Sequence, residues 1–151
     1  VEISIRMKLT DNWFTSLSQN EEGNLIFVTG RLDLEEFRLS RKLKICVEIK
    51  WPYQSDAEGM PLDEDANLIA EIEPLLRKGM EKDKLAILTG NYTGGGAKYW
   101  VWYTRHLPTF GERLNSILAP YRTLPLEIEC SEDEDWDEYL DMMSMQTSDE
   151  D

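Results

Sequence analysis

Residues 97–104, with the sequence AKYWVWYT, carry large apolar or aromatic side chains at successive positions. In a strand, Tyr99, Val101 and Tyr103 would point to one face of a sheet. Trp100 and Trp102 would point to the other face. A strand that is apolar on both faces is typical of the middle of a sheet that is covered on both sides. We therefore expect the rest of the fold to be built around this strand.

Residues 42–51 have the clearest alternation of apolar and polar positions, which predicts a strand with one face toward a core. The core side comprises Leu43, Ile45, Val47, Ile49 and Trp51, and the other side comprises Lys44, Cys46, Glu48 and Lys50. Shorter β-prone runs predict further strands at residues 1–9, 13–18, 25–29, 85–92 and 126–130. Turns with glycine at residues 20–24 and 94–96 indicate two hairpins.

Two longer stretches, residues 63–82 and 108–121, carry the apolar stripe of an amphipathic helix. The first begins with three acids, which suit the positive end of a helix dipole. Pro74 lies inside it, so we expect the helix to kink or break near residues 70–74. The apolar residues of 31–41 follow neither the spacing of a helix nor the alternation of a strand, so this stretch is assigned as a loop or a short helix. An acidic helix is predicted at residues 133–143 and a disordered acidic tail at residues 144–151.

From residue 42 onward, the predicted order is strand, helix, strand, strand, helix, strand. This order is typical of the α+β class and of the ferredoxin-like split βαβ fold (βαββαβ), an antiparallel sheet with both helices on one face. We expect one domain at residues 1–143, made of an N-terminal strand and hairpin (1–30), the βαββαβ core (42–130) and the acidic C-terminal helix (133–143). Trp100 and Trp102 are expected on the second face of the sheet, together with Lys44, Cys46, Glu48, Lys50, Glu127 and Glu129. The hairpin, the segment around Trp136 or another subunit would cover them.

Charge adds a second constraint. The chain of 151 residues has a formal net charge of −14, and residues 132–151 hold ten acids and no Lys or Arg. A nucleic-acid backbone calls for clustered Lys and Arg, so no nucleic-acid partner is expected. We interpret the acidic end as a solubilising segment, or else as an arm for a basic partner or a nucleic-acid mimic. The sequence contains no membrane-length apolar run and no signal-peptide pattern, so we expect no membrane association and a cytoplasmic location.

Residues that could carry catalysis are sparse. His106 is the single histidine, and a loop histidine that bonds to the backbone is the favoured interpretation. Cys46 and Cys130 are expected on neighbouring strands with opposite orientations, so no disulfide is predicted. The glycines at 94–96 lack the Lys that follows in a phosphate-binding loop, and the acids at 58–65 are better explained by helix capping than by a divalent cation. No catalytic residue, cofactor or metal ligand is therefore predicted.

Several short motifs resemble those of a known family. They are Trp13, the turn at Gly23, the GMP motif at Gly59 to Pro61 ahead of Ile72 and Glu73, the hairpin that ends in Tyr103, and DWDEY at residues 135–139. Together they resemble the bacterial domain-of-unknown-function 695 family over most of the chain. Family members often have Asp where this chain has Pro74. The family has no established activity, so the resemblance implies no catalytic residues. Similar domains accompany the ribonuclease E regulator B family, acidic ferredoxin-like proteins that inhibit an RNase by binding it, which is a likeness of fold and charge alone.

We expect a non-enzymatic binding or regulatory module that acts through protein–protein contacts. The candidate partner-binding residues are Trp100, Trp102, Lys44, Glu48, Trp136 and Tyr139, because exposed aromatic rings mark interfaces. The partner would be another protein or a second copy of this chain. One alternative is an acidic inhibitor similar to the ribonuclease regulators. The other is an enzyme that acts on a small molecule or by hydrolysis, with a cleft near His106, Arg105 and the acids at residues 63–65.

Overall fold

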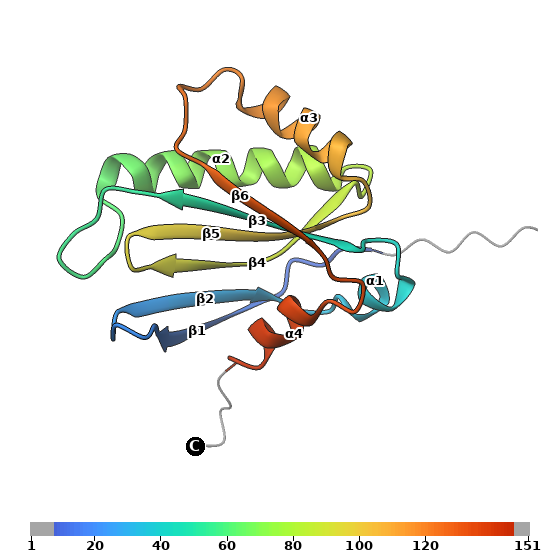
Figure 1. Cartoon of the computed structure of the whole chain (residues 1–151), viewed down its shortest axis with the longest axis horizontal. Coiled ribbons are helices and arrows are strands. Elements are labelled where there is room, and N and C mark those ends of the chain that lie inside the picture. The colour runs from blue at the N-terminus through green and yellow to red at the C-terminus, as the bar shows by residue number, and fades with distance from the viewer. Residues whose placement is uncertain (1–7, 147–151) are drawn as a thin grey trace, which may run out of the picture.

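The computed structural model describes residues 8–146, which form a mixed α/β structure with one six-stranded antiparallel sheet (Figure 1). The strand order is β1-β2-β4-β5-β3-β6. The strands are β1 (Trp13–Gln19), β2 (Leu25–Arg31), β3 (Ile45–Pro52), β4 (Ala86–Gly94), β5 (Ala97–Thr104) and β6 (Glu127–Glu132). The helices are α1 (Glu35–Ser40), α2 (Asp63–Glu81), α3 (Leu107–Leu118) and α4 (Asp137–Met143). Residues 1–7 of the predicted first strand and residues 147–151 of the predicted tail lie outside the described residues.

β5 lies between β4 and β3, in the interior position that its apolar pattern predicts. Helices α2 and α3 cover one face of the sheet, while α1 and α4 cover part of the other face (Figure 1). Alternate side chains of β5 therefore enter two cores. Trp100 and Trp102 pack against α2 and α3, whereas Val101 and Tyr103 pack on the side of α1 and α4. All four side chains are fully buried.

The expected placement of the two tryptophans is wrong. Residues that pair across neighbouring strands share a face, and the register pairs Trp102 with Val47 and Trp100 with Ile49. Both indole rings therefore face α2 and α3, and the opposite side of β3, which carries Glu48, does not contain them. A slip of one residue moves every side chain of a strand to the other face. Because α2 and β4 separate β3 from β5 in the chain, no tight turn specifies this register from the sequence.

The N-terminal hairpin extends the sheet and does not cover it. β2 pairs with β4, from Ile26 opposite Gly94 to Gly30 opposite Gly90, so the sheet has six strands instead of the four of the predicted core. Helices α2 and α3 cover Trp100 and Trp102, so these rings have none of the three covers expected for them. On the second face, the segment around Trp136 packs on the sheet. Its indole ring is fully buried, with its centroid 4.4 Å from that of the Tyr103 ring.

Helix α2 runs through Pro74 as one continuous helix, so the predicted break is absent. Proline removes the hydrogen bond that its own N–H would donate to the carbonyl four residues earlier, here that of Ala70. Ala70 and Pro74 are both exposed, so water can reach the carbonyl that is left without this bond. No helix among residues 8–146 is both long and apolar enough to cross a membrane.

Candidate functional site

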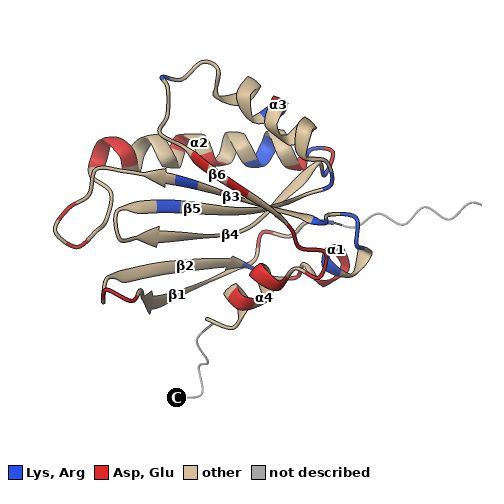
Figure 2. Ribbon diagram, in the orientation of Figure 1, with Lys and Arg blue, Asp and Glu red and all other residues tan. Residues whose placement is uncertain are grey.

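Acidic residues gather on β6 and α4 (Figure 2), and together with Glu48 they form an acidic surface on the sheet face opposite α2 and α3. We call the part of this surface on the strands the acidic floor and define it by Glu48 and Lys50 of β3, Tyr99 of β5, and Glu127 and Glu129 of β6. The strand register places Glu48 opposite Glu129 and Lys50 opposite Glu127. These residues line a hollow of about 510 Å³. Three carboxylates and one ammonium group therefore share the surface of two adjacent strands.

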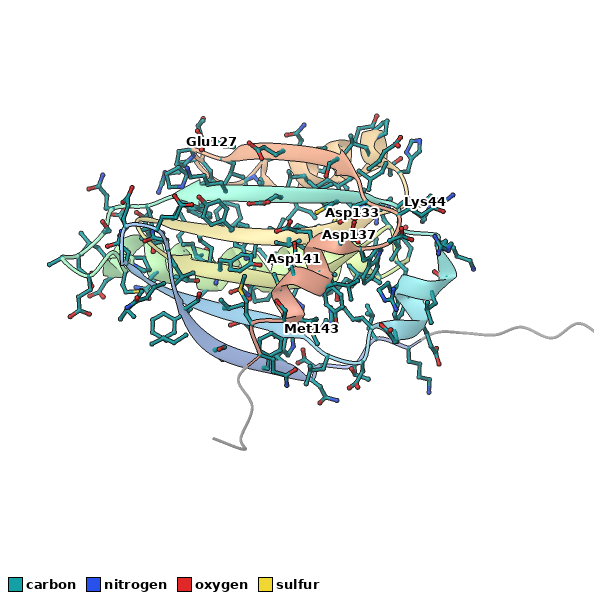
Figure 3. All side chains as sticks on the ribbon, turned by 60° about the horizontal axis from the view of Figure 1, so that its bottom comes forward. Lys44, Glu127, Asp133, Asp137, Asp141 and Met143 are labelled. Atoms are coloured by element: carbon teal, nitrogen blue, oxygen red, sulfur yellow. The ribbon has the colours of Figure 1, made fainter. Side chains whose placement is uncertain are left out.

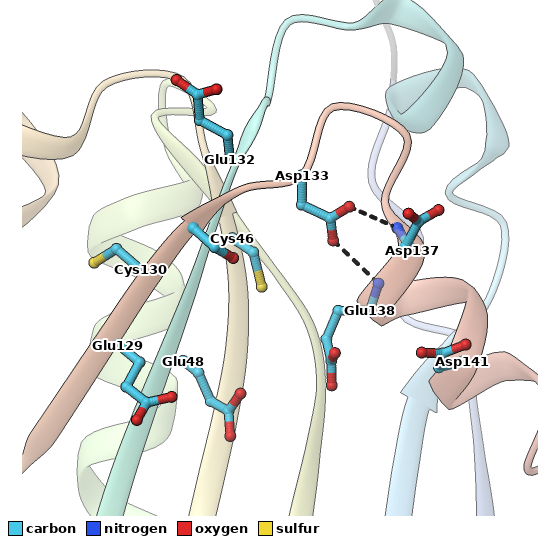
Figure 4. Close-up of a pocket in the computed structure, with 10 residues that line it drawn as sticks. Cys46, Glu48, Glu129, Cys130, Glu132, Asp133, Asp137, Glu138 and Asp141 are labelled. Carbon is cyan, nitrogen blue, oxygen red and sulfur yellow. Dashed lines mark hydrogen bonds between the residues drawn. The ribbon is translucent and has the colours of Figure 1, made fainter.

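Helix α4 forms a wall beside the acidic floor (Figures 3 and 4). Its acidic side chains Asp137, Glu138 and Asp141 line a second hollow of about 330 Å³. Glu48 and Glu129 line both hollows, which therefore adjoin. The floor and the wall together bring carboxylates from β3, β6 and α4 to one concave surface.

Asp133 fixes the start of this wall. Its carboxylate accepts hydrogen bonds from the backbone N–H groups of Asp137, at 2.8 Å, and Glu138, at 3.0 Å (Figure 4). Trp136 adopts a left-handed conformation with φ 61° just before the helix, and its indole N–H donates to the carbonyl of Leu43 at 2.8 Å. The first N–H groups of a helix lack partners within the helix, and the Asp133 carboxylate satisfies two of them in α4. The Trp136 indole anchors the same end of the helix to the segment before β3.

Several carboxylates of this surface lack a cationic partner within the described part of the chain. Among the described residues, no Lys or Arg forms an ion pair with Glu48, Glu129 or Glu138, although Lys50 pairs with a neighbouring acid. Burial raises the pKa of Glu48, and repulsion from Glu138 and Glu129 raises it further. The pKa of Glu138 is raised first by burial and then by nearby acids of the wall. A cation placed among these carboxylates would relieve their repulsion.

Lys50 shows how this surface holds a cation. Its Nζ lies 5.8 Å from the centre of the Tyr99 ring and 3.6 Å from the carboxylate of Glu127. Attraction to Tyr99 and to Glu127 raises the pKa of Lys50. An aromatic face beside a carboxylate is a favourable environment for Lys and Arg side chains. At the edge of the surface, Lys44 pairs with Glu134 over 3.8 Å.

The cysteines of this region are not arranged for nucleophilic chemistry. Cys46 lines the second hollow, but burial raises the pKa of its thiol to about 12, so the thiol stays protonated near neutral pH. Cys130 is exposed on β6, and both cysteines are free, as the prediction of no disulfide requires. No group of three or more His, Cys, Asp and Glu side chains within residues 8–146 is placed to hold a metal ion.

The structure assembles part of the predicted set of binding residues. Glu48 lies in the acidic floor and Lys44 at its edge. Trp136 and Tyr139 are buried under α4, with ring centroids 5.4 Å apart, so they hold the wall in place and present no exposed ring. Trp100 and Trp102, in the core below α2 and α3, lie outside this surface.

The acids of the wall were not singled out from the sequence. Glu138 and Asp141 are three residues apart, a spacing that places two side chains on the same side of a helix. The predicted helix at residues 133–143 therefore already implied that these acids share one side. Their position beside Glu48 depends on how α4 docks, which the helical spacing does not specify.

The cleft expected near His106 is not assembled. His106 begins α3, where its Nδ1 accepts the backbone N–H of Thr109 at 3.3 Å, in agreement with a loop histidine bonded to the backbone. Arg105 lies 3.8 Å from Asp83, just beyond the C-terminal end of α2. The acids at residues 63–65 lie at the N-terminal end of α2. A helix of 19 residues is about 28 Å long, so these acids are about that far from Asp83 and Arg105. The two groups lie at opposite ends of α2 (Figure 1).

Comparison with known proteins identifies a family. The chain matches the model of a family of unknown function, DUF695, over residues 11–144, which include the acidic floor and the wall. No curated protein and no solved structure matches the chain. The resemblance inferred from the short motifs is therefore confirmed, and the chain belongs to the DUF695 family of unknown function.

Proposed function

We propose that this protein is a non-enzymatic binding module that holds a basic segment of a partner protein on its acidic floor, against the wall of α4. The proposal is carried by Glu48, Glu129 and Glu138, whose carboxylates line two adjoining hollows without a cationic partner among the described residues. Burial and mutual repulsion raise the pKa values of Glu48 and Glu138, so Lys or Arg side chains between them would stabilise the ionised carboxylates.

The arrangement of the acids favours a peptide segment with several basic residues as the ligand. The carboxylates are distributed along β6 and α4, from Glu127 near one end of β6 to Asp141 on the helix (Figure 3). A segment with several Lys or Arg residues can place one cation near each acid, which gives electrostatic complementarity along its length. Lys50, whose Nζ lies over the Tyr99 ring, shows that this surface already accommodates one cation between an aromatic face and a carboxylate.

Isothermal titration with a peptide of alternating Lys and Ala residues tests this proposal. The peptide should bind the wild-type chain, and its affinity should fall as NaCl rises from about 0.05 to about 0.5 M, because screening weakens exposed charge interactions. Replacing two acids of the floor at once, Glu48→Gln and Glu129→Gln, should weaken binding by at least about fivefold.

The matched control changes the same amount of charge elsewhere. Glu64 on α2 and Glu112 on α3 are exposed and lie on the helices that cover the opposite face. The pair Glu64→Gln and Glu112→Gln should change the affinity by less than about twofold. Equal losses for the two double variants would mean that net charge alone attracts the peptide, and the proposal would then be wrong. A peptide that does not bind the wild-type chain would also contradict it.

A second candidate is an acidic inhibitor of a nucleic-acid-binding enzyme, favoured by the row of acids on α4. Deleting residues 132–151 is a poor test, because it would remove the fully buried Trp136 from the core. Replacing the acids of the wall, Asp137→Asn, Glu138→Gln and Asp141→Asn, leaves the buried Trp136 in place. A purified ribonuclease with a basic substrate groove should be inhibited by the wild-type chain and not by this variant. Equal inhibition by both chains would eliminate the wall as the inhibitory element.

We also propose that β3, α2, β4, β5, α3 and β6 form a unit of the ferredoxin-like split βαβ class. The run β4-β5-β3-β6 supports this assignment, because the first and third strands of the unit, β3 and β5, lie inside it. In this assignment, the hairpin of β1 and β2 and the helix α4 are additions to the unit. The acidic floor then lies on the sheet face that the two helices of the unit leave uncovered.

A further inference from the structure

Within residues 8–146, no strand pairs with the outer side of β6. β6 is an outer strand that pairs with β3, and all six of its residues are exposed. The N–H of Asp133 donates to the carbonyl of Lys44 at 2.7 Å, which continues the register of the two strands. In an antiparallel pair, every second residue bonds to the partner strand. By this alternation, Ile128, Cys130 and Glu132 direct their N–H and C=O groups away from β3.

The two faces beside this open edge differ in chemistry. On one face, Glu127 and Glu129 belong to the acidic floor. On the other face, Ile128 is 47 % exposed and borders a hollow of about 400 Å³ between β6, α3 and the segment that joins them. Leu118 and Leu124 also line this hollow. An added strand would therefore meet Glu127 and Glu129 on one face, and Ile128, Cys130 and, at the end of the strand, Glu132 on the other.

We infer that the basic segment binds by adding a strand to the open edge of β6. This inference rests on the proposed function and adds the conformation and sequence pattern of the partner segment. Successive side chains of a strand point to opposite faces, so every second residue would meet the acidic floor and the residues between would meet Ile128 and its hollow. Main-chain hydrogen bonds to β6 would supply affinity. The partner is then an extended segment in which basic and apolar residues alternate.

A second copy of this chain is a poorer occupant of the edge. If β6 paired with β6 of another copy about Glu129, the two Glu129 carboxylates would lie directly opposite each other. Like charges in that position destabilise an antiparallel pair. A partner with Lys or Arg at the same position would instead place an ammonium or guanidinium group beside Glu129 and Glu127.

Two peptides of equal composition separate strand addition from simple charge attraction. In the first, Lys and Val alternate, and in the second, all Lys residues precede all Val residues. Fluorescence anisotropy at low salt should give a higher affinity for the alternating peptide. Cys130→Pro removes one outward N–H donor, a change that an edge strand tolerates. It should weaken binding of the alternating peptide by at least about tenfold, whereas Cys130→Ala should change it by less than about twofold.

Hydrogen exchange of the wild-type chain tests the same point without a substitution. The alternating peptide should slow exchange at the amides of Ile128, Cys130 and Glu132. If both peptides bind equally and these amides exchange at an unchanged rate, strand addition is wrong while the proposed function stands. If these amides are already protected in the chain alone, the edge is occupied and the inference fails. If neither peptide binds, the proposed function fails as well.

Discussion

The side chain of Glu48 is partly buried and has two acidic neighbours, Glu138 and Glu129. Its pKa in the folded chain is raised by burial and by repulsion from Glu138 and Glu129, so the folded chain holds this proton more tightly than the unfolded chain. Protonation of Glu48 therefore stabilises the fold. The contribution is fully present below the ordinary carboxyl pKa of 4.5 and is lost as the pH rises through the raised pKa of the folded chain.

Glu48→Gln should raise the free energy of unfolding near pH 7 by about 0.2–1 kcal/mol, the range for partly exposed charges. At about pH 3.5, the difference between variant and wild type should shrink, because the carboxyl is then mostly protonated in both states. Urea denaturation at the two pH values measures both effects. As a control, Glu127→Gln removes an acid that pairs with Lys50 and should give no stabilisation. A Glu48→Gln chain less stable than wild type near pH 7 would contradict this electrostatic description.

Arg31 is the buried cation that joins the hairpin to α2. It is 2 % exposed, its Nη1 lies 2.9 Å from the Glu81 carboxylate, and the same nitrogen donates to the carbonyl of Leu88 at 3.1 Å. Without Arg31, the Glu81 carboxylate keeps, among the described residues, only the backbone N–H of Leu88, at 2.9 Å, and the more distant Arg77, at 3.9 Å. Breaking a buried ion pair by removing one partner is strongly destabilising. We therefore predict that Arg31→Met lowers the free energy of unfolding by about 3–5 kcal/mol in urea denaturation.

Arg38 provides the matched control for Arg31. It pairs with Glu35 on the surface, where the Glu35 side chain is 64 % exposed. Exposed ion pairs contribute about 0–1 kcal/mol, so Arg38→Met should have a small effect. Similar losses for Arg31→Met and Arg38→Met would show that burial does not set the strength of the Arg31 interaction.

At the scale of the element, α4 depends on one aromatic anchor. Trp136 is fully buried and stacks on Tyr103. Its indole N–H donates to the carbonyl of Leu43, in the segment just before β3. Tyr103 in turn donates its hydroxyl to Asp133 at 2.6 Å, which links the central strand to the start of α4. The wall of the acidic surface is thus held by a strand whose sequence is apolar on both faces.

Trp136→Ala should lower the free energy of unfolding by about 3–5 kcal/mol, the usual loss for a buried aromatic side chain. Leu140→Ala, on the same helix but 41 % exposed, should lower it by less than about 1 kcal/mol. Urea denaturation of both variants makes the comparison. If the two losses are equal, α4 is not anchored through its tryptophan.

The elements themselves were largely predictable from local pattern. Residues 97–104 form β5 with the predicted bounds, because a strand that is apolar on both faces is specified by its own residues. At Pro74 the helix continues without a break, because the missing hydrogen bond lies on the solvent side of α2. The prediction of the sheet face to which Trp100 and Trp102 point was wrong, because that face depends on pairing with β3, which lies far away in the chain.

At the scale of the whole molecule, the acidic surface arises from packing between distant segments. The alternation in residues 42–51 and 126–130 predicts that Glu48 and Glu129 point to the same face of the sheet, and strand pairing places them opposite each other. Glu138 reaches them through the docking of α4, which leaves no periodic signal in the sequence. Most acids of residues 132–141 therefore line a hollow of the folded structure, whereas composition alone favoured a solubilising tail.

The most direct test of the account is amide chemical-shift mapping of the isotope-labelled chain titrated with the alternating Lys and Val peptide. We predict that the perturbed amides gather on β3, β6 and α4, around Glu48, Glu129 and Glu138. Amides near Glu64 and Glu112, on the helices of the opposite face, should remain unchanged. Perturbations spread evenly over both faces, or centred on α2 and α3, would contradict a basic-segment site on the acidic floor.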